Sequence, residues 1–188
     1  SVAQIGYMML GVSLVTVSGI AASIIYIFNH AIIKAAVFIG IGCIVYRLGS
    51  EKIVDMKGVF TLMPMTSIAI LIACLGLIGI PSTAGFISKW YLLLSVVEQK
   101  AWLSLFVILL GSLMSIIYVW RLFEVMYFDK PDAQLINNKN SVIQSDKIPA
   151  SMILSLWVLV ILSLYFGLET SFTYGLAEAA GKYLLMTK

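Results

Sequence analysis

The sequence predicts an all-α polytopic membrane protein with about five transmembrane helices, one of them discontinuous over residues 60–97. Hydrophobic residues make up 61% of the chain and charged residues only 11%, whereas soluble domains carry roughly 25% charged residues. The mean hydropathy is +1.04, and the apolar residues fall in runs close to the ~20 residues that a membrane-spanning helix needs. We therefore expect a single membrane domain over residues 1–188.

Five apolar stretches follow one another along the chain. They are residues 2–17, 19–46, 60–97, 101–128 and 150–168. Between them we expect a tight turn at Ser18 and Gly19, a polar link at 48–58 and a long polar loop at 129–149, with a weakly amphipathic tail from residue 169. The first stretch is slightly short of a full span and follows Ser1 rather than Met, so we expect a carboxy-terminal fragment of a longer protein.

The third stretch is broken near its middle by Gly79, Pro81 and Gly85. Proline cannot continue a helix, and glycine adopts backbone angles that no helix uses. An unbroken helix over residues 60–94 would be ~50 Å long, against ~30 Å of hydrocarbon. No charged residue separates the two halves, so we expect one span with an unwound middle rather than a re-entrant pair. Pro64 suits the first turn of the first half-helix.

Basic residues are unevenly divided between the two predicted sides of the membrane. With five spans, the links at 48–58 and 129–149 share one side. Seven basic residues lie there and three lie opposite, namely Arg47, Lys52, Lys57, Arg121, Lys130, Lys139 and Lys147 against Lys100, Lys182 and Lys188. The positive-inside rule then makes loop 129–149 cytoplasmic and the carboxy terminus external, which we place in a bacterial inner membrane.

Lys34 lies midway along the second stretch, ~18 Å from either interface. A lysine stem of ~6 Å cannot bring its ammonium to the headgroups from there, so Lys34 must face protein or water inside the bundle. His30 precedes it by four residues on the same helix face. Two titratable groups one turn apart at this depth indicate a proton relay. The alternative for His30 is a structural hydrogen bond.

Lys89 is the third candidate proton carrier, near the amino end of the second half-helix. The positive helix dipole there disfavours an ammonium, which would make this lysine easy to deprotonate. The alternative is a lysine that marks a helix end at the interface. Arg121 and Glu124, at i, i+3, form a candidate interfacial ion pair.

Other functional classes find no support in the composition. The formal net charge of +3, without a basic run that carries interleaved aromatics, argues against nucleic-acid binding. His30 is the only histidine, and Cys43 and Cys74 lie apart in apolar stretches, so we expect no metal or redox cofactor. We find no nucleophile, metal set or paired carboxylates at an interface, so an integral-membrane enzyme is not indicated.

Three motifs resemble, in order and spacing, those of the antiporter-like membrane subunits shared by respiratory complex I and the Mrp-type multisubunit Na+/H+ antiporters. They are SVAQIGY at residues 1–7, NHAIIKAAVF at 29–38 and GIPSTAGFISKWYL at 79–92. The resemblance implies a fold of about fourteen helices with two inverted repeats, of which this chain would be the last five helices. It also implies a proton path along the membrane midplane, with His30 and Lys34 at its centre and Lys89 at its far end.

Within this family, the chain most resembles the D-type component of Mrp antiporters. Trp90 follows Lys89, where the large complex I subunit and the A-type Mrp component tend to carry an acidic residue, and residues 118–128 also resemble the D-type component. Small departures are Ser82, where a second proline is common, and Ser88, where a glycine is frequent. The implied function is proton translocation within a multisubunit Na+/H+ antiporter, with other membrane subunits, lipid, H+ and Na+ as partners. The alternatives are a proton-pumping subunit of complex I or of a membrane hydrogenase, and a structural membrane subunit.

Overall fold

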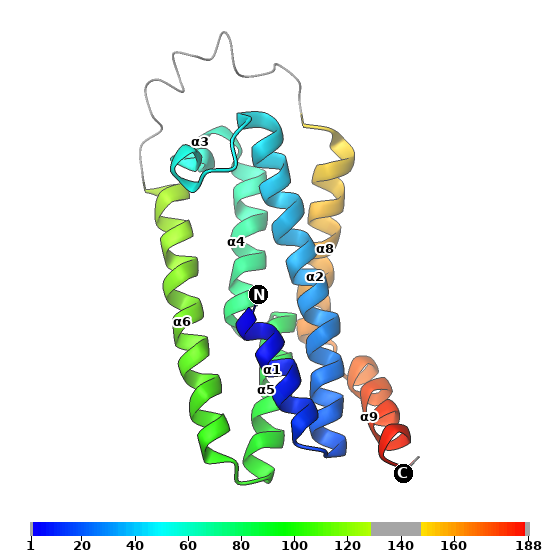
Figure 1. Ribbon diagram of the computed structural model, residues 1–188. Helices are drawn as coiled ribbons and strands as arrows, with labels where there is room; N and C mark the ends of the chain where they lie inside the picture. Colours follow the sequence, from blue (N-terminus) through cyan, green and yellow to red (C-terminus); the bar gives the residue numbers. More distant parts are fainter. Residues whose placement is uncertain (1, 129–147, 187–188) are drawn as a thin grey trace.

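The computed structural model describes residues 2–128 and 148–186, which are mostly helical (Figure 1). The helices are α1 (Val2–Ser13), α2 (Val17–Leu48), the 3-10 helix η1 (Ile53–Met56), α3 (Val59–Leu62), α4 (Pro64–Ile78), α5 (Ala84–Glu98), α6 (Trp102–Tyr127), α8 (Ala150–Leu168) and α9 (Ser171–Met186). Residues 129–147, most of the predicted polar loop, lie outside the described residues.

Helix α2 is the centre of the bundle, and α1, α4, α5, α8 and α9 all pack against it. Small buried residues on α2, among them Ala21, Ala22 and Ala36, let these neighbours approach closely. Its first turn is capped by Thr16, whose hydroxyl accepts a hydrogen bond from the backbone N–H of Gly19 at 3.1 Å. The helix therefore begins at Val17, and the turn predicted at Ser18 and Gly19 lies just before it instead, where Val15 has φ +51°.

The third stretch crosses the bundle once, in pieces. Figure 1 shows α4 in the upper half and α5 below it, joined at mid-height, which confirms one span with an unwound middle. Each helix has 15 residues, ~22 Å of rise, so the two together exceed a hydrocarbon core of ~30 Å. Pro64 is the first residue of α4, as predicted, and a second interruption at Met63 separates α4 from the short helix α3.

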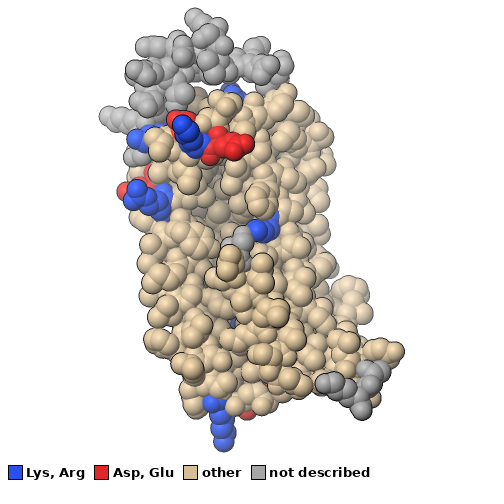
Figure 2. Space-filling view, in the orientation of Figure 1, with Lys and Arg blue, Asp and Glu red and all other residues tan. Residues whose placement is uncertain are grey.

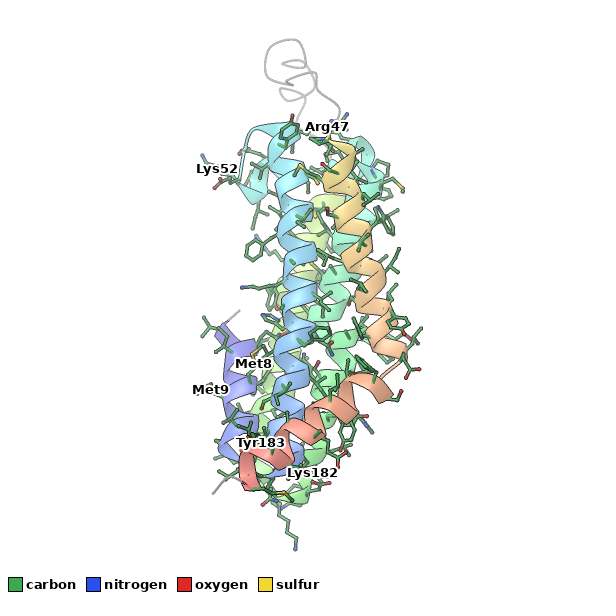
Figure 3. All side chains as sticks on the ribbon, turned by 90° about the vertical axis from the view of Figure 1, so that its right-hand side faces the viewer. Met8, Met9, Arg47, Lys52, Lys182 and Tyr183 are labelled. Carbon is green, nitrogen blue, oxygen red and sulfur yellow. The ribbon has the colours of Figure 1, made fainter. Side chains whose placement is uncertain are left out.

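Three of the described helices, α2, α6 and α8, are long and apolar enough to span a membrane by themselves. Large apolar side chains on α6, such as Leu103 and Phe106, are exposed, as expected of a surface that meets lipid. Most charged side chains on the face in Figure 2 lie in its upper part or at its lower end, and one Lys or Arg side chain lies near mid-height. Figure 3 shows Arg47 and Lys52 at one end and Lys182 at the other. The protein is thus a multi-pass membrane protein.

The tail forms helix α9, which crosses α2 obliquely (Figure 3). The Lys182 ammonium lies 2.7 Å from a Glu178 carboxylate oxygen, one helical turn away. Gly181 lets α9 lie close to the start of α2, because a Cβ there would be 3.0 Å from the Val17 carbonyl oxygen. The tail is therefore packed on the bundle, and its place along the membrane interface stays a prediction.

Candidate functional site

The junction between α4 and α5 is built around a helix end that leaves two carbonyls open. Gly79 has φ +85°, and its N–H bonds the Gly76 carbonyl at 3.1 Å. The N–H of Ile80 bonds the Leu75 carbonyl at 3.2 Å, which completes a Schellman motif. This motif does not use the carbonyls of Leu77 and Ile78. At membrane depth such groups need partners from elsewhere in the protein or from water.

Lys89 supplies those partners. Its ammonium donates to the Ile78 carbonyl at 2.7 Å and to the Leu77 carbonyl at 3.4 Å, and the side chain is only 6% exposed. The stem runs past Gly79, where a Cβ would lie 3.0 Å from the Lys89 Cδ atom. The ammonium therefore sits at the negative, carboxyl end of α4, which stabilises it. The expected destabilisation by the dipole of its own helix stays a prediction, and the recorded hydrogen bonds of the ammonium lie across the junction, at the end of α4.

Gly85 lies inside helix α5 and not in the unwound segment, which runs from Gly79 to Thr83. A Cβ at Gly85 would be only 1.8 Å from the Gly76 carbonyl oxygen, so this glycine lets the end of α4 touch α5 backbone to backbone. The prediction that Gly79, Pro81 and Gly85 together form the break is thus right for the first two residues. A glycine is needed at position 85 because α4 and α5 pack closely there, and not because the backbone needs unusual angles.

Asn29 ties the central helix to the start of α5. Its side-chain nitrogen donates to the Ala84 carbonyl at 3.0 Å and to the Ser88 hydroxyl at 2.9 Å, and the residue is 1% exposed. The Ser88 hydroxyl in turn donates to the Ala84 carbonyl at 3.0 Å. This connection fixes the first turn of α5, and with it Lys89, against α2. The sequence analysis included Asn29 only as the first residue of the motif at 29–38 and gave it no partner.

We expect Ser88→Ala to destabilise the protein more than Ser95→Ala. Both serines are buried on α5, and both hydroxyls donate to the carbonyl one turn back, that of Ser95 to Tyr91 at 2.9 Å. Only Ser88 also accepts a recorded bond from another helix, so its loss should lower the free energy of unfolding by about 0.5–1 kcal/mol more. Thermal unfolding of the two purified variants measures this. Equal midpoints would show that the Asn29 contact contributes nothing.

His30 and Lys34 are both half-buried on α2. His30 lines a small pocket that reaches toward the α4–α5 junction, with Gln4, Tyr26 and Ser88 among its other walls. The Lys34 ammonium lies 5.2 Å from the centre of the Phe38 ring, and Phe38 is 64% exposed. The structure thus directs His30 toward the junction that holds Lys89, and it leaves Lys34 near the surface of the described bundle.

Gln4 and Tyr26 belong to the site although sequence reasoning missed both. The Tyr26 hydroxyl donates to the Gln4 side-chain oxygen, and the Gln4 side-chain nitrogen donates to the Leu77 carbonyl at 3.5 Å. A signal was present, since Tyr26, His30 and Lys34 follow one another at intervals of four on one helix face. Gln4 is also an uncharged polar residue within the first apolar stretch.

Arg121 and Glu124 are both exposed near the end of α6 that precedes residue 129. They lie far along the chain from the junction, at a charged end of the bundle. Their ion pair stays a prediction, and exposed pairs of this kind contribute little stability, typically about 0–1 kcal/mol.

Residues 1–115 match the family described as "NADH:quinone oxidoreductase/Mrp antiporter, TM". NADH-quinone oxidoreductase subunit N of Desulforudis audaxviator is 35% identical over 127 residues, which cover 68% of this chain and 25% of that protein. Subunit M of Rickettsia bellii is 30% identical over 172 residues, 91% of this chain and 33% of that protein. F(420)H(2) dehydrogenase subunit L of Methanosarcina mazei is 31% identical over 183 residues, 90% of this chain and 26% of that protein.

A solved structure of the Mrp complex from Dietzia sp. DQ12-45-1b shares the fold. It matches 97% of this chain and 41% of its own chain, with a TM-score of 0.84 and 22% identity. The chain spans between a quarter and a third of the length of the three subunits from Desulforudis, Rickettsia and Methanosarcina. The family match covers more than half of the chain and includes the helices that carry His30, Lys34 and Lys89. The protein therefore belongs to the family of transmembrane subunits shared by NADH:quinone oxidoreductases and Mrp antiporters.

Proposed function

We propose that this chain carries protons through the membrane as part of a multisubunit Na+/H+ antiporter. The observation that carries the proposal is Lys89, buried at the junction of a discontinuous helix, with its recorded hydrogen bonds made to backbone carbonyls. An ionisable residue at membrane depth marks an ion or proton pathway by default. His30 on helix α2 lines a pocket beside this junction, and Lys34, one turn further along α2, would continue the pathway toward the surface of the described bundle.

The partners of Lys89 suit a group that gains and loses its proton. Breaking a buried pair of opposite charges leaves an uncompensated charge, at a cost of about 3–5 kcal/mol. Deprotonation of an ammonium that is held by carbonyls leaves only neutral groups behind. The Leu77 carbonyl then keeps its hydrogen bond from the Gln4 side-chain nitrogen, and the Ile78 carbonyl can bond water, so neither protonation state of Lys89 is prohibitively costly.

The assignment to an Mrp-type antiporter, rather than to a complex I-type enzyme, rests on the sequence. Trp90 after Lys89 favours it, and so do residues 118–128, which resemble the D-type Mrp component. The second candidate is a proton-pumping subunit of an NADH-quinone oxidoreductase, because the named relatives include subunits of such enzymes. In either assembly the partners would be other membrane subunits. We place the end that carries Arg47 and Lys52, with loop 129–149, on the cytoplasmic side of a bacterial inner membrane.

Everted membrane vesicles that carry the complete complex separate the two candidates. An imposed pH gradient is followed with a fluorescent dye, and Na+ is added in the absence of any electron donor. An antiporter dissipates the gradient when Na+ arrives. If Na+ has no effect, while NADH oxidation by the same complex builds a gradient, the antiporter assignment is wrong and the complex I-type assignment replaces it.

A further inference from the structure

We propose that a structural water molecule binds between α4 and α6, where the hydroxyls of Ser67 and Tyr127 hold it. The site lies in the upper part of the bundle in Figure 1, between α4 and the last turns of α6. The water links α6 to the half-helix α4 and takes no part in proton transfer. The inference is therefore independent of the proposed function.

Two buried hydroxyl groups at this place have no hydrogen-bond partner within the described part of the chain. They belong to Ser67, whose residue is 0% exposed, and to Tyr127. Burying a hydroxyl without a hydrogen bond costs free energy, and most buried polar groups in native proteins are bonded to protein or to ordered water. A water between α4 and α6 would supply the partner that both hydroxyls lack.

The hydroxyl of Ser67 differs from those of two other buried helical serines. Ser88 and Ser95 each donate to the carbonyl one turn back in α5, at 3.0 and 2.9 Å. The backbone N–H of Ser67 bonds the Met63 carbonyl at 3.0 Å, but the Ser67 hydroxyl makes no bond of this kind. Ser67 instead lines a pocket between α4 and α6, so its hydroxyl is available to a ligand there.

The ring of Tyr127 is held in place by aromatic contacts. Its centre lies 4.5 Å from that of Phe60 on α3 and 4.3 Å from that of Phe123 on α6, and it is inclined to them by only 28° and 30°. These stacked contacts restrict the position of the Tyr127 hydroxyl. Tyr127 lines the same pocket as Ser67, so the two hydroxyls belong to one site.

The pocket has room for one water molecule. Its volume is about 10 Å³, near the roughly 10–15 Å³ that a single buried water needs. The walls are mostly apolar, but Ser67, Cys74 and Tyr127 bring two hydroxyls and a thiol to them. A buried water needs two to four polar partners, which the two hydroxyls and the weakly bonding thiol provide. The two hydroxyls make no direct hydrogen bond to each other, so one water can join both.

Removing either hydroxyl distinguishes an occupied pocket from a dry one by the sign of the effect. In a dry pocket, Ser67→Ala and Tyr127→Phe each remove an unsatisfied buried polar group, which should leave stability unchanged or raise it. In an occupied pocket, each substitution takes a partner from the water and leaves the other hydroxyl unsatisfied. We therefore expect each variant to lower the midpoint of thermal unfolding of the purified complete complex, by roughly 2–4 °C.

The double variant Ser67→Ala/Tyr127→Phe tests whether the two hydroxyls share one water. Both single variants would lose the same water, so the shift of the double variant should be smaller than the sum of the single shifts. Tyr165→Phe on α8 is the matched control, because Tyr165 is 55% exposed, and we expect its midpoint to equal that of the wild type.

High-resolution electron cryo-microscopy maps of the same complexes supply a second readout. We expect density for a water between α4 and α6 in the wild type and in Tyr165→Phe, and its loss in the double variant with the helices unmoved. The proposal is overturned by a wild-type pocket without this density, by a single variant that is not destabilised, or by a double variant whose shift equals the sum of the single shifts.

Discussion

Replacing Lys89 with arginine in the complete complex is expected to abolish proton-coupled exchange although the positive charge is kept. Arginine is not deprotonated in proteins, so it can bond the carbonyls of Leu77 and Ile78 but cannot release a proton. The loss should be roughly hundredfold or more, as for the removal of a positioned proton carrier. The measurement is the initial rate of gradient dissipation in vesicles, normalised to the amount of assembled complex.

Lys182→Arg is the matched control, because Lys182 is a surface lysine that pairs with Glu178 on α9. We expect this variant to transport normally. If Lys89→Arg also transports normally, Lys89 acts as a fixed charge that holds the junction together, and the relay hypothesis fails. Lys89→Ala completes the comparison, with transport abolished and assembly retained. Loss of assembly together with transport would favour the structural role.

Gly85→Ala is expected to lower stability and to stop transport as well. The added methyl group would lie 1.8 Å from the Gly76 carbonyl oxygen, and both partners are backbone that cannot turn aside. The end of α4 must then move away from α5, which separates Lys89 from the carbonyls it bonds. Overpacking of this kind costs about 1–3 kcal/mol, which should lower the midpoint of thermal unfolding of the purified complex.

Gly175→Ala on α9 is the control for the Gly85 prediction, since a Cβ at Gly175 meets no atom within 4 Å. Alanine is the better helix former by about 1 kcal/mol, so the control should be neutral or slightly stabilising. Equal unfolding midpoints for the two variants would contradict the close contact between α4 and α5.

The helices themselves were predictable from the sequence because each is a long apolar run with a recognisable end. The expected bounds of 101–128 and 150–168 differ little from α6 and α8. Pro64 and Gly79 act locally, and their effects on the backbone follow from residue type alone. The turn before α2 was misplaced because Thr16 is the residue that caps the helix, while Ser18 and Gly19 continue it.

The site was less predictable because its contacts join residues far apart in the chain. Lys89 is bonded across the junction, and Asn29 is bonded to residues 55 and 59 positions away. Whether a glycine such as Gly85 serves backbone freedom or close packing depends on what stands opposite, here the Gly76 carbonyl. Gln4 and Tyr26 meet only because α1 folds back against α2. The residue pattern of a single helix does not predict such contacts between helices.

The most direct test is proton flux through the purified complex in liposomes, with Na+ on one side, comparing wild type with Lys34→Ala and Lys89→Ala. The account predicts that both substitutions stop the flux while the complex still assembles, because each removes a group on the only path we propose through these helices. Undiminished flux in both variants would show that the protons cross elsewhere in the complex, and that these residues belong to a shared fold whose transport lies in another subunit.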